Sequence, residues 1–162
     1  SKTLIGRYYL PSHTSDGKLY VHGLITQGAY TGLYSQMVFN FSVWEDYRTT
    51  PAKRLYVQFS GAGGYKGGNF DVSALTIFDR WVTLAATINF STGKITAYLD
   101  GIKIGEATVT MEPFGLGAGS TLSDAVRVLH ASQVNYLAGT KGTWSQVHEG
   151  IITQAEIAKC VA

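Results

Sequence analysis

Apolar and polar residues alternate with a period of two along much of this chain. Residues 36–43 read QMVFNFSV and residues 54–59 read RLYVQF, so that every second side chain is apolar with a single interruption at Val38. Such alternation is typical of a β-strand that buries one face. Both segments are therefore predicted strands.

The clearest pattern lies between residues 81 and 104. Residues 81–90 (WVTLAATINF) and 94–99 (KITAYL) alternate strictly enough to predict two strands joined by a short turn. Asp100 and Gly101 then form a two-residue hairpin signal before a third strand. This meander supplies most of the predicted core, which consists of Phe41, Val82, Leu84, Ile88, Ile95 and Leu99.

Weaker strand signals complete the pattern. They lie near residues 3–10, 18–25, 70–78, 105–111, 122–131 and 143–149. One helix is predicted at the end of the chain, where Thr153 and Glu156 have the spacing of a capping box before Ile157. About ten strands with almost no helix indicate an antiparallel sandwich of the jelly-roll kind, or a barrel.

Composition narrows the class of protein. With 162 residues, the chain is long enough for one core, so residues 1–162 are predicted to form a single domain. Thirteen basic and eleven acidic residues give a net charge of +2 without charged runs, so no nucleic-acid partner or membrane insertion is expected. The sequence starts directly in a strand-like segment, and we expect it to be part of a longer protein.

A jelly roll constrains where the loops gather, because consecutive strands run in opposite directions. If every strand crosses the sandwich once, alternate loops share one end. One predicted end collects the glycine-rich connections 26–34, 61–69, 91–93 and 112–121. The other end collects 11–17, 44–52, 79–80, 100–101 and 132–142.

Three motifs resemble a known family. Residues 81–105 (WVTLAATINFSTGKITAYLDGIKIG), 39–44 (FNFSVW) and 154–157 (QAEI) are similar to the central meander, an early strand and the closing helical turn of concanavalin A-like lectin and laminin G-like domains, including pentraxin-like ones. The resemblance implies an all-β, two-sheet antiparallel jelly-roll sandwich with one short C-terminal helix. It also implies an extracellular sugar-binding or adhesion module, and the fold is common in phage tail and bacterial surface proteins.

Catalytic chemistry is not predicted. Glycosidases on this sandwich need two carboxylates facing one cleft, whereas the adjacent Glu45 and Asp46 would point to opposite faces of a strand. The four histidines lack metal-ligand spacing, so each is expected to lie at the surface or in a hydrogen bond. These histidines are His13, His22, His130 and His148.

Two loops are candidates for glycan contact. Sugars stack their apolar faces on aromatic rings and hydrogen-bond to planar polar groups. Asp46, Tyr47 and Arg48 offer both in one loop, and Tyr47 and Arg48 lie outside the alternating core pattern. Tyr65 and Asn69 in the glycine-rich loop are the alternative. If neither loop binds, the candidate is a concave sheet face with outward residues such as Tyr56, Gln58 or Tyr98. No cofactor is predicted. Calcium is left open, because Asp46 shares the predicted loop end with Asp79.

The sequence thus predicts a non-catalytic carbohydrate-binding or adhesion module of a larger extracellular or virion-surface protein. Its partner would be a glycan or glycoconjugate, and affinity would be raised by multivalency, including homo-oligomerisation through the parent protein. The alternative hypothesis is a structural or assembly domain of a phage tail or surface protein, with no glycan ligand.

Overall fold

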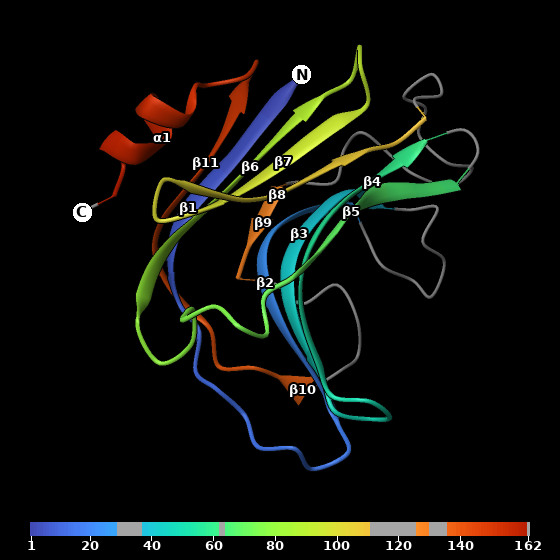
Figure 1. Cartoon of the computed structure of the whole chain (residues 1–162), viewed down its shortest axis with the longest axis vertical. Helices are drawn as coiled ribbons and strands as arrows, with labels where there is room; N and C mark the ends of the chain where they lie inside the picture. Colours follow the sequence, from blue (N-terminus) through green and yellow to red (C-terminus); the bar gives the residue numbers. More distant parts are fainter. Residues whose placement is uncertain (29–36, 62–63, 111–125, 130–135, 162) are drawn as a thin grey trace.

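The described residues form two stacked β-sheets and one short helix (Figure 1). The computed structural model describes residues 1–28, 37–61, 64–110, 126–129 and 136–161. This architecture confirms the predicted all-β jelly-roll sandwich with a C-terminal helix. Among the described residues, no helix has the length and apolar character needed to cross a membrane.

The first sheet has five strands in the order β11, β1, β6, β7, β8, and all of its neighbouring strands are antiparallel. The predicted hairpin turn joins β7 to β8: Asp100 and Gly101 have φ angles of 49° and 79°. Positive φ at both central residues is what a two-residue type I′ turn requires. The five strands are β11 (Lys141–Glu149), β1 (Lys2–Tyr9), β6 (Trp81–Asn89), β7 (Lys94–Leu99) and β8 (Ile102–Thr108).

The second sheet has the order β10, β2, β3, β4, β5, with β9 also paired to β2. The two-residue β10 runs parallel to β2, which departs from the predicted fully antiparallel pattern. Figure 1 shows β2 to β5 bowed, with the first sheet on their convex side, so the outer face of the second sheet is concave. Its strands are β10 (Tyr136–Leu137), β2 (Leu19–Gly28), β3 (Met37–Asp46), β4 (Ala52–Gly61), β5 (Gly64–Asp71) and β9 (Val126–Val128).

The core lies between the two sheets and contains the predicted residues. Leu99 is only partly buried and packs against the edge of this cluster. The other five are at most 1% exposed, namely Phe41, Val82, Leu84, Ile88 and Ile95. Full burial of a side chain of this size stabilises the fold by about 1.5–3 kcal/mol, so the meander supplies much of the stability.

Two predictions are wrong, namely the loop at residues 61–69 and the strand near residues 70–78. The glycine-rich segment, predicted as a loop, forms most of strand β5 and pairs with β4, whereas the chain leaves the sheet after Asp71. A Cβ on Gly68 would lie 2.6 Å from the ring of Phe70, and one on Gly67 would lie 2.4 Å from the carbonyl oxygen of Val57. These glycines therefore permit close packing inside a strand, and they are not turn residues.

Helix α1 (Gln154–Lys159) covers the outer face of the first sheet. The predicted capping box is present: the Thr153 side chain accepts from the backbone N–H of Glu156, and the Glu156 side chain accepts from the backbone N–H of Thr153. Ile157 is buried against Ile5 and Ala85. Strand β6 is consequently buried on both faces over most of its length.

Candidate functional site

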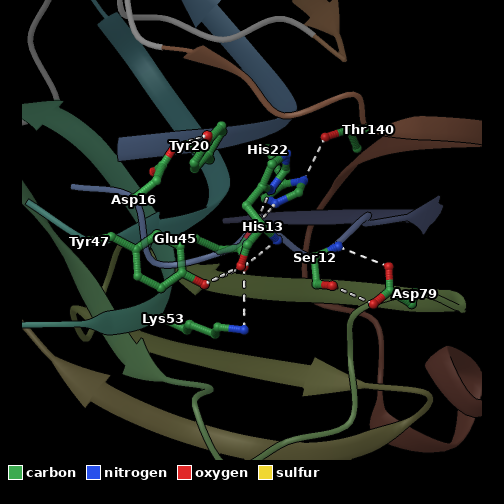
Figure 2. A network of polar contacts seen from close by, with 10 residues as sticks. All are labelled: Ser12, His13, Asp16, Tyr20, His22, Glu45, Tyr47, Lys53, Asp79 and Thr140. Carbon is green, nitrogen blue, oxygen red and sulfur yellow. Dashed lines mark hydrogen bonds and ion pairs between the residues drawn. The ribbon is translucent and has the colours of Figure 1, made fainter. Parts of the chain in front are cut away.

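Glu45 is a fully buried carboxylate at the end of the hydrophobic core. It follows Phe41 and Val43 on the inward face of β3, so the alternation that buries these apolar side chains also buries Glu45. A buried charge is tolerated only when polar groups surround it. Figure 2 shows several such groups converging on Glu45 from β2, β4 and the segment between β1 and β2.

Each oxygen of Glu45 has its own set of partners. Oε2 lies 2.7 Å from His13 Nδ1 and 3.0 Å from His22 Nε2. Oε1 accepts a hydrogen bond of 3.0 Å from the Tyr47 hydroxyl and lies 3.4 Å from Lys53 Nζ. The backbone N–H of His13 also donates to Oε1, at 3.3 Å. These contacts compensate the cost of burying the charge.

The ionisation of Glu45 follows from these partners. Burial by itself would raise its pKa, but hydrogen bonds from His22 and His13 outweigh this effect and lower the pKa to about 2. Burial lowers the pKa of His22, which favours a neutral ring. A neutral His22 donates a hydrogen bond from Nε2 to Glu45. Its Nδ1 then accepts a hydrogen bond from the Thr140 hydroxyl, 2.9 Å away.

Tyr47 belongs to this internal network, which corrects the expectation that it lies outside the core. It is only 9% exposed, and its single hydroxyl proton is shared between the carbonyl oxygen of His13 at 2.9 Å and Glu45 Oε1 at 3.0 Å. Its neighbours Asp46 and Arg48 lie at the surface, where the guanidinium binds the carboxylate at 2.7 and 3.0 Å. Hydrogen bonds from Arg48 hold the pKa of Asp46 below its usual value.

The predicted grouping of loops is confirmed at this end of the sandwich. Asp79 accepts hydrogen bonds from the backbone and hydroxyl of Ser12, which ties segment 11–17 to segment 79–80. The expectation that each histidine lies at the surface or in a hydrogen bond is confirmed for His13 and His22, and the fold brings both onto Glu45. His130 lies outside the described residues, and His148 contacts Gln146 on β11.

Asp46 and Asp79 do not fit a calcium site. The carboxylate of Asp46 is engaged by Arg48, and that of Asp79 by Ser12. Calcium takes six to eight oxygen ligands, and carboxylates already held by protein donors do not offer such a set.

A second polar and aromatic group lies on the outer face of the second sheet. Trp44 on β3 packs against Tyr56 on β4, with ring centroids 4.7 Å apart and an interplanar angle of 45°. The indole of Trp44 donates to the Ser42 hydroxyl at 2.9 Å, which fixes its orientation. Both rings are half-buried, so part of each remains accessible to solvent.

The register of β3, β4 and β5 places polar groups beside these rings. Asn69 lies opposite Tyr56, and Arg54 lies opposite Trp44 on one side and Asp71 on the other. Arg54 donates to the side-chain oxygen of Asn69 at 3.4 Å. We call Trp44, Tyr56, Arg54 and Asn69 the outer-face cluster.

The predicted site residues are therefore distributed differently from the two loops expected. Asn69 lies in the middle of β5, within the outer-face cluster, and Asp46 is two residues beyond Trp44 on β3. Tyr65 is in β5 opposite Ser60, but its side chain lies outside the described part of the chain.

Comparison with known proteins identifies the fold. No protein-family model matches this sequence, and no curated protein matches it. Among solved structures, CBM40 of the Ruminococcus gnavus IT-sialidase, bound to alpha2,3 sialyllactose, has a TM-score of 0.65 at 11% identity; the match covers 99% of this chain and 82% of that one. The chain has the concanavalin A-like jelly-roll fold.

Two further structures share this jelly roll. The heptameric SAP-like pentraxin of Limulus polyphemus has a TM-score of 0.60 at 13% identity, over 99% of this chain and 69% of that one. A leech intramolecular trans-sialidase has a TM-score of 0.63 at 14% identity, and the match covers 99% of this chain but 23% of the larger protein. The family resemblance seen in the sequence is thereby confirmed at the level of the fold.

Sequence reasoning missed two features of this jelly roll. It treated Glu45 only as a neighbour of Asp46, although its place after Phe41 and Val43 in the alternation already pointed inward. It also preferred the loops and named a concave sheet face with Tyr56 only as the fallback, so Arg54, the other member of the outer-face cluster on this strand, was not singled out. Strand pairing brings these residues together with Trp44, and one sequence does not reveal that pairing.

Proposed function

We propose that this jelly roll is a non-catalytic carbohydrate-binding module that holds a glycan on the outer face of its second sheet. The observation that carries this proposal is the half-buried pair Trp44 and Tyr56, flanked by Arg54 and Asn69. The outer-face cluster thus combines the two kinds of group that sugars need, aromatic rings and polar side chains.

The chemistry of the outer-face cluster suits a pyranose ring. The C–H face of a sugar is apolar and stacks on aromatic rings, which Trp44 and Tyr56 supply. The hydroxyl groups require donors and acceptors in fixed positions. Arg54 supplies only donors, whereas the amide of Asn69 supplies both a donor and an acceptor, and Arg54 donates to the side-chain oxygen of Asn69.

The absence of catalysis in this proposal rests on the orientation of the carboxylates. Hydrolysis of a glycosidic bond uses two carboxyl groups that flank the same bond. Glu45 faces the core and is held by His13 and His22, whereas the neighbouring Asp46 faces the surface and is held by Arg48. This pair therefore does not flank a common substrate.

The proposed context is an extracellular or virion-surface protein that carries this module. A binding surface of one aromatic pair gives modest affinity, and several copies on one particle would raise it through effective concentration. Structural relatives were solved with alpha2,3 and alpha2,6 sialyllactose. Sialylated glycans are therefore the first class to test for this chain.

A glycan array tests the proposal. We expect wild type to bind a defined set of glycans, and Tyr56→Ala to lose these signals. The matched control is Tyr98→Ala, which removes a tyrosine from a 290 Å³ pocket in the first sheet, also lined by Thr96 and Lys103. Loss of binding in Tyr98→Ala with retention in Tyr56→Ala would overturn the assignment of the face. Absence of any glycan signal for wild type would overturn the proposal itself.

A further inference from the structure

We propose that His13, His22 and Glu45 form a binding site for a zinc ion. Two imidazoles and one carboxylate are a ligand set that Zn²⁺ takes in proteins, with water in the fourth position. This site lies inside the loop end of the sandwich, and its ligands are separate from the outer-face cluster.

The three ligand atoms already converge. One nitrogen from each histidine and one oxygen of Glu45 lie within 4.8 Å of one another. Oε2 of Glu45 is 2.7 Å from His13 Nδ1 and 3.0 Å from His22 Nε2. Tetrahedral zinc with bonds near 2.0–2.1 Å separates its ligand atoms by about 3.3 Å. Small outward movements of the two rings would therefore accommodate the ion.

The groups around the ligands orient them for this role. Metal-bound histidines usually contact a second polar group through their other ring nitrogen, and the other nitrogen of His22 lies 2.9 Å from the Thr140 hydroxyl. His13 is stacked on Tyr20, with ring centroids 3.8 Å apart and an interplanar angle of 13°. Tyr20 is in turn held by a hydrogen bond from its hydroxyl to Asp16.

Besides these movements, zinc binding requires that each ring present to the ion a nitrogen that carries no proton. His22 donates from Nε2 to Glu45 in the metal-free network, so this nitrogen must give up its proton to bind the ion. The proton then resides on Nδ1, from which His22 donates to the Thr140 hydroxyl. His13 faces Glu45 through Nδ1, so this nitrogen is the one that would bind the ion.

Among the described residues, Lys53 is the lysine or arginine that contacts Glu45, and it does not occupy the zinc position. Its Nζ lies 3.4 Å from Oε1 of Glu45, and the Tyr47 hydroxyl lies 3.0 Å from the same oxygen. Both histidines face the other oxygen, Oε2. The Lys53 side chain is 26% exposed, so its ammonium group can turn toward solvent. The side chain of His13 is 19% exposed, which gives the ion an approach from solvent.

Binding would join three parts of the chain. His13 lies in the segment between β1 and β2, His22 lies in β2, and Glu45 lies in β3. An ion that binds the folded state in preference to the unfolded chain raises the thermal midpoint by mass action. Zinc would therefore fasten segment 11–17 to the second sheet.

The test uses Zn²⁺ alone with the full chain, produced without a histidine tag and stripped with a chelator. Calorimetric titration and thermal melting are measured for wild type, His13→Gln and Glu45→Gln. The control is His148→Gln, which removes a histidine on β11 that contacts Gln146 and not Glu45. Co²⁺ absorption provides a second readout, because it reports tetrahedral coordination directly.

We expect one Zn²⁺ per chain, a higher thermal midpoint with zinc, and affinity at least about tenfold weaker in His13→Gln and Glu45→Gln but not in His148→Gln. If Glu45→Gln does not fold, His13→Gln decides the matter, because the part-exposed His13 lies outside the strands. Absence of stoichiometric binding would overturn the proposal. Equal binding by wild type and His13→Gln would also overturn it, since that result indicates adventitious surface binding.

Discussion

Trp44 and Tyr56 lie side by side on neighbouring strands, with ring centroids 4.7 Å apart, on the concave outer face of the second sheet. Trp44 directly faces Arg54 in the β3–β4 pairing, and Tyr56 faces Asn69 in the β4–β5 pairing. The aromatic pair is thus bordered by the Arg54 guanidinium and the Asn69 amide, and the guanidinium donates a hydrogen bond to the amide oxygen. Because these groups sit on paired strands and not on loops, their spacing is fixed before a ligand arrives, which reduces the entropy lost on binding.

Tyr47→Ala is expected to destabilise the protein by about 3 kcal/mol, because it removes a buried ring and leaves a cavity. Tyr47→Phe should cost about 1 kcal/mol, since only the hydrogen bonds to Glu45 and to the His13 carbonyl are lost. Denaturant unfolding measures both changes. The control Arg48→Ala breaks an exposed ion pair and should cost less than about 1 kcal/mol. A Tyr47→Ala variant as stable as wild type would refute the internal role of Tyr47.

Leu84→Ala should lower the free energy of unfolding by about 2–5 kcal/mol, because Leu84 is fully buried between the sheets. Ile102→Ala is the matched control, since Ile102 is 67% exposed and its truncation should change stability by no more than about 0.5 kcal/mol. Thermal or denaturant unfolding of both variants checks the face assignment. Equal effects of the two substitutions would contradict it.

Tyr8 should make the fold sensitive to alkaline pH. Burial raises the pKa of Tyr8 well above its usual value, although its hydrogen bond with Ser145 partly opposes this. In the unfolded chain the phenol ionises near pH 10, so the stabilisation is complete below pH 10 and is lost as the pH rises beyond it. Each further pH unit should cost about 1.4 kcal/mol until the folded-state pKa is reached.

The matching experiment is an unfolding series from pH 8 to 11 with wild type and Tyr8→Phe. The variant should be less stable at pH 8, because the hydrogen bond to Ser145 is lost, and its stability should fall less steeply above pH 10. Identical slopes in the two proteins would show that Tyr8 does not carry the alkaline sensitivity.

The isolated domain should not hydrolyse oligosaccharides, because Glu45 is enclosed by His13, His22 and Tyr47 and has no accessible carboxylate partner in Asp46. Incubation with the glycans that bind on the array, followed by chromatography of the products, checks this expectation. Reproducible turnover that Glu45→Gln abolishes would contradict it.

Alternation predicted the fold because one-sided burial leaves a period of two in the sequence. It succeeded for β6 and β7, and for the turn at Asp100 and Gly101, where backbone conformation restricts residue choice. It failed for β5, whose glycines mimic a loop, although Gly67 makes room for the carbonyl oxygen of Val57 on the paired strand β4. No local pattern distinguishes these two uses of glycine, because the decisive neighbour is brought by tertiary packing.

The candidate sites were harder to predict, because each is assembled across strands. His13 and Glu45 are 32 residues apart in sequence, and their contact depends on the loop end that segments 11–17 and 44–52 share. The parity of the strands predicted this shared end correctly but did not indicate which side chains turn inward. Tyr47 shows the consequence: its loop position suggested exposure, yet its ring is buried beside Glu45.

The most direct test of the central claim is a heteronuclear NMR titration with a glycan that binds on the array. The chain contains three tryptophans, which give three indole N–H signals: Trp44 lies in the second sheet, and Trp81 and Trp144 lie in the first. Trp44→Phe assigns the relevant signal. The account predicts that the Trp44 signal shifts in a saturable manner while the other two stay unchanged. A shift of Trp81 or Trp144 with an unmoved Trp44 signal would contradict it.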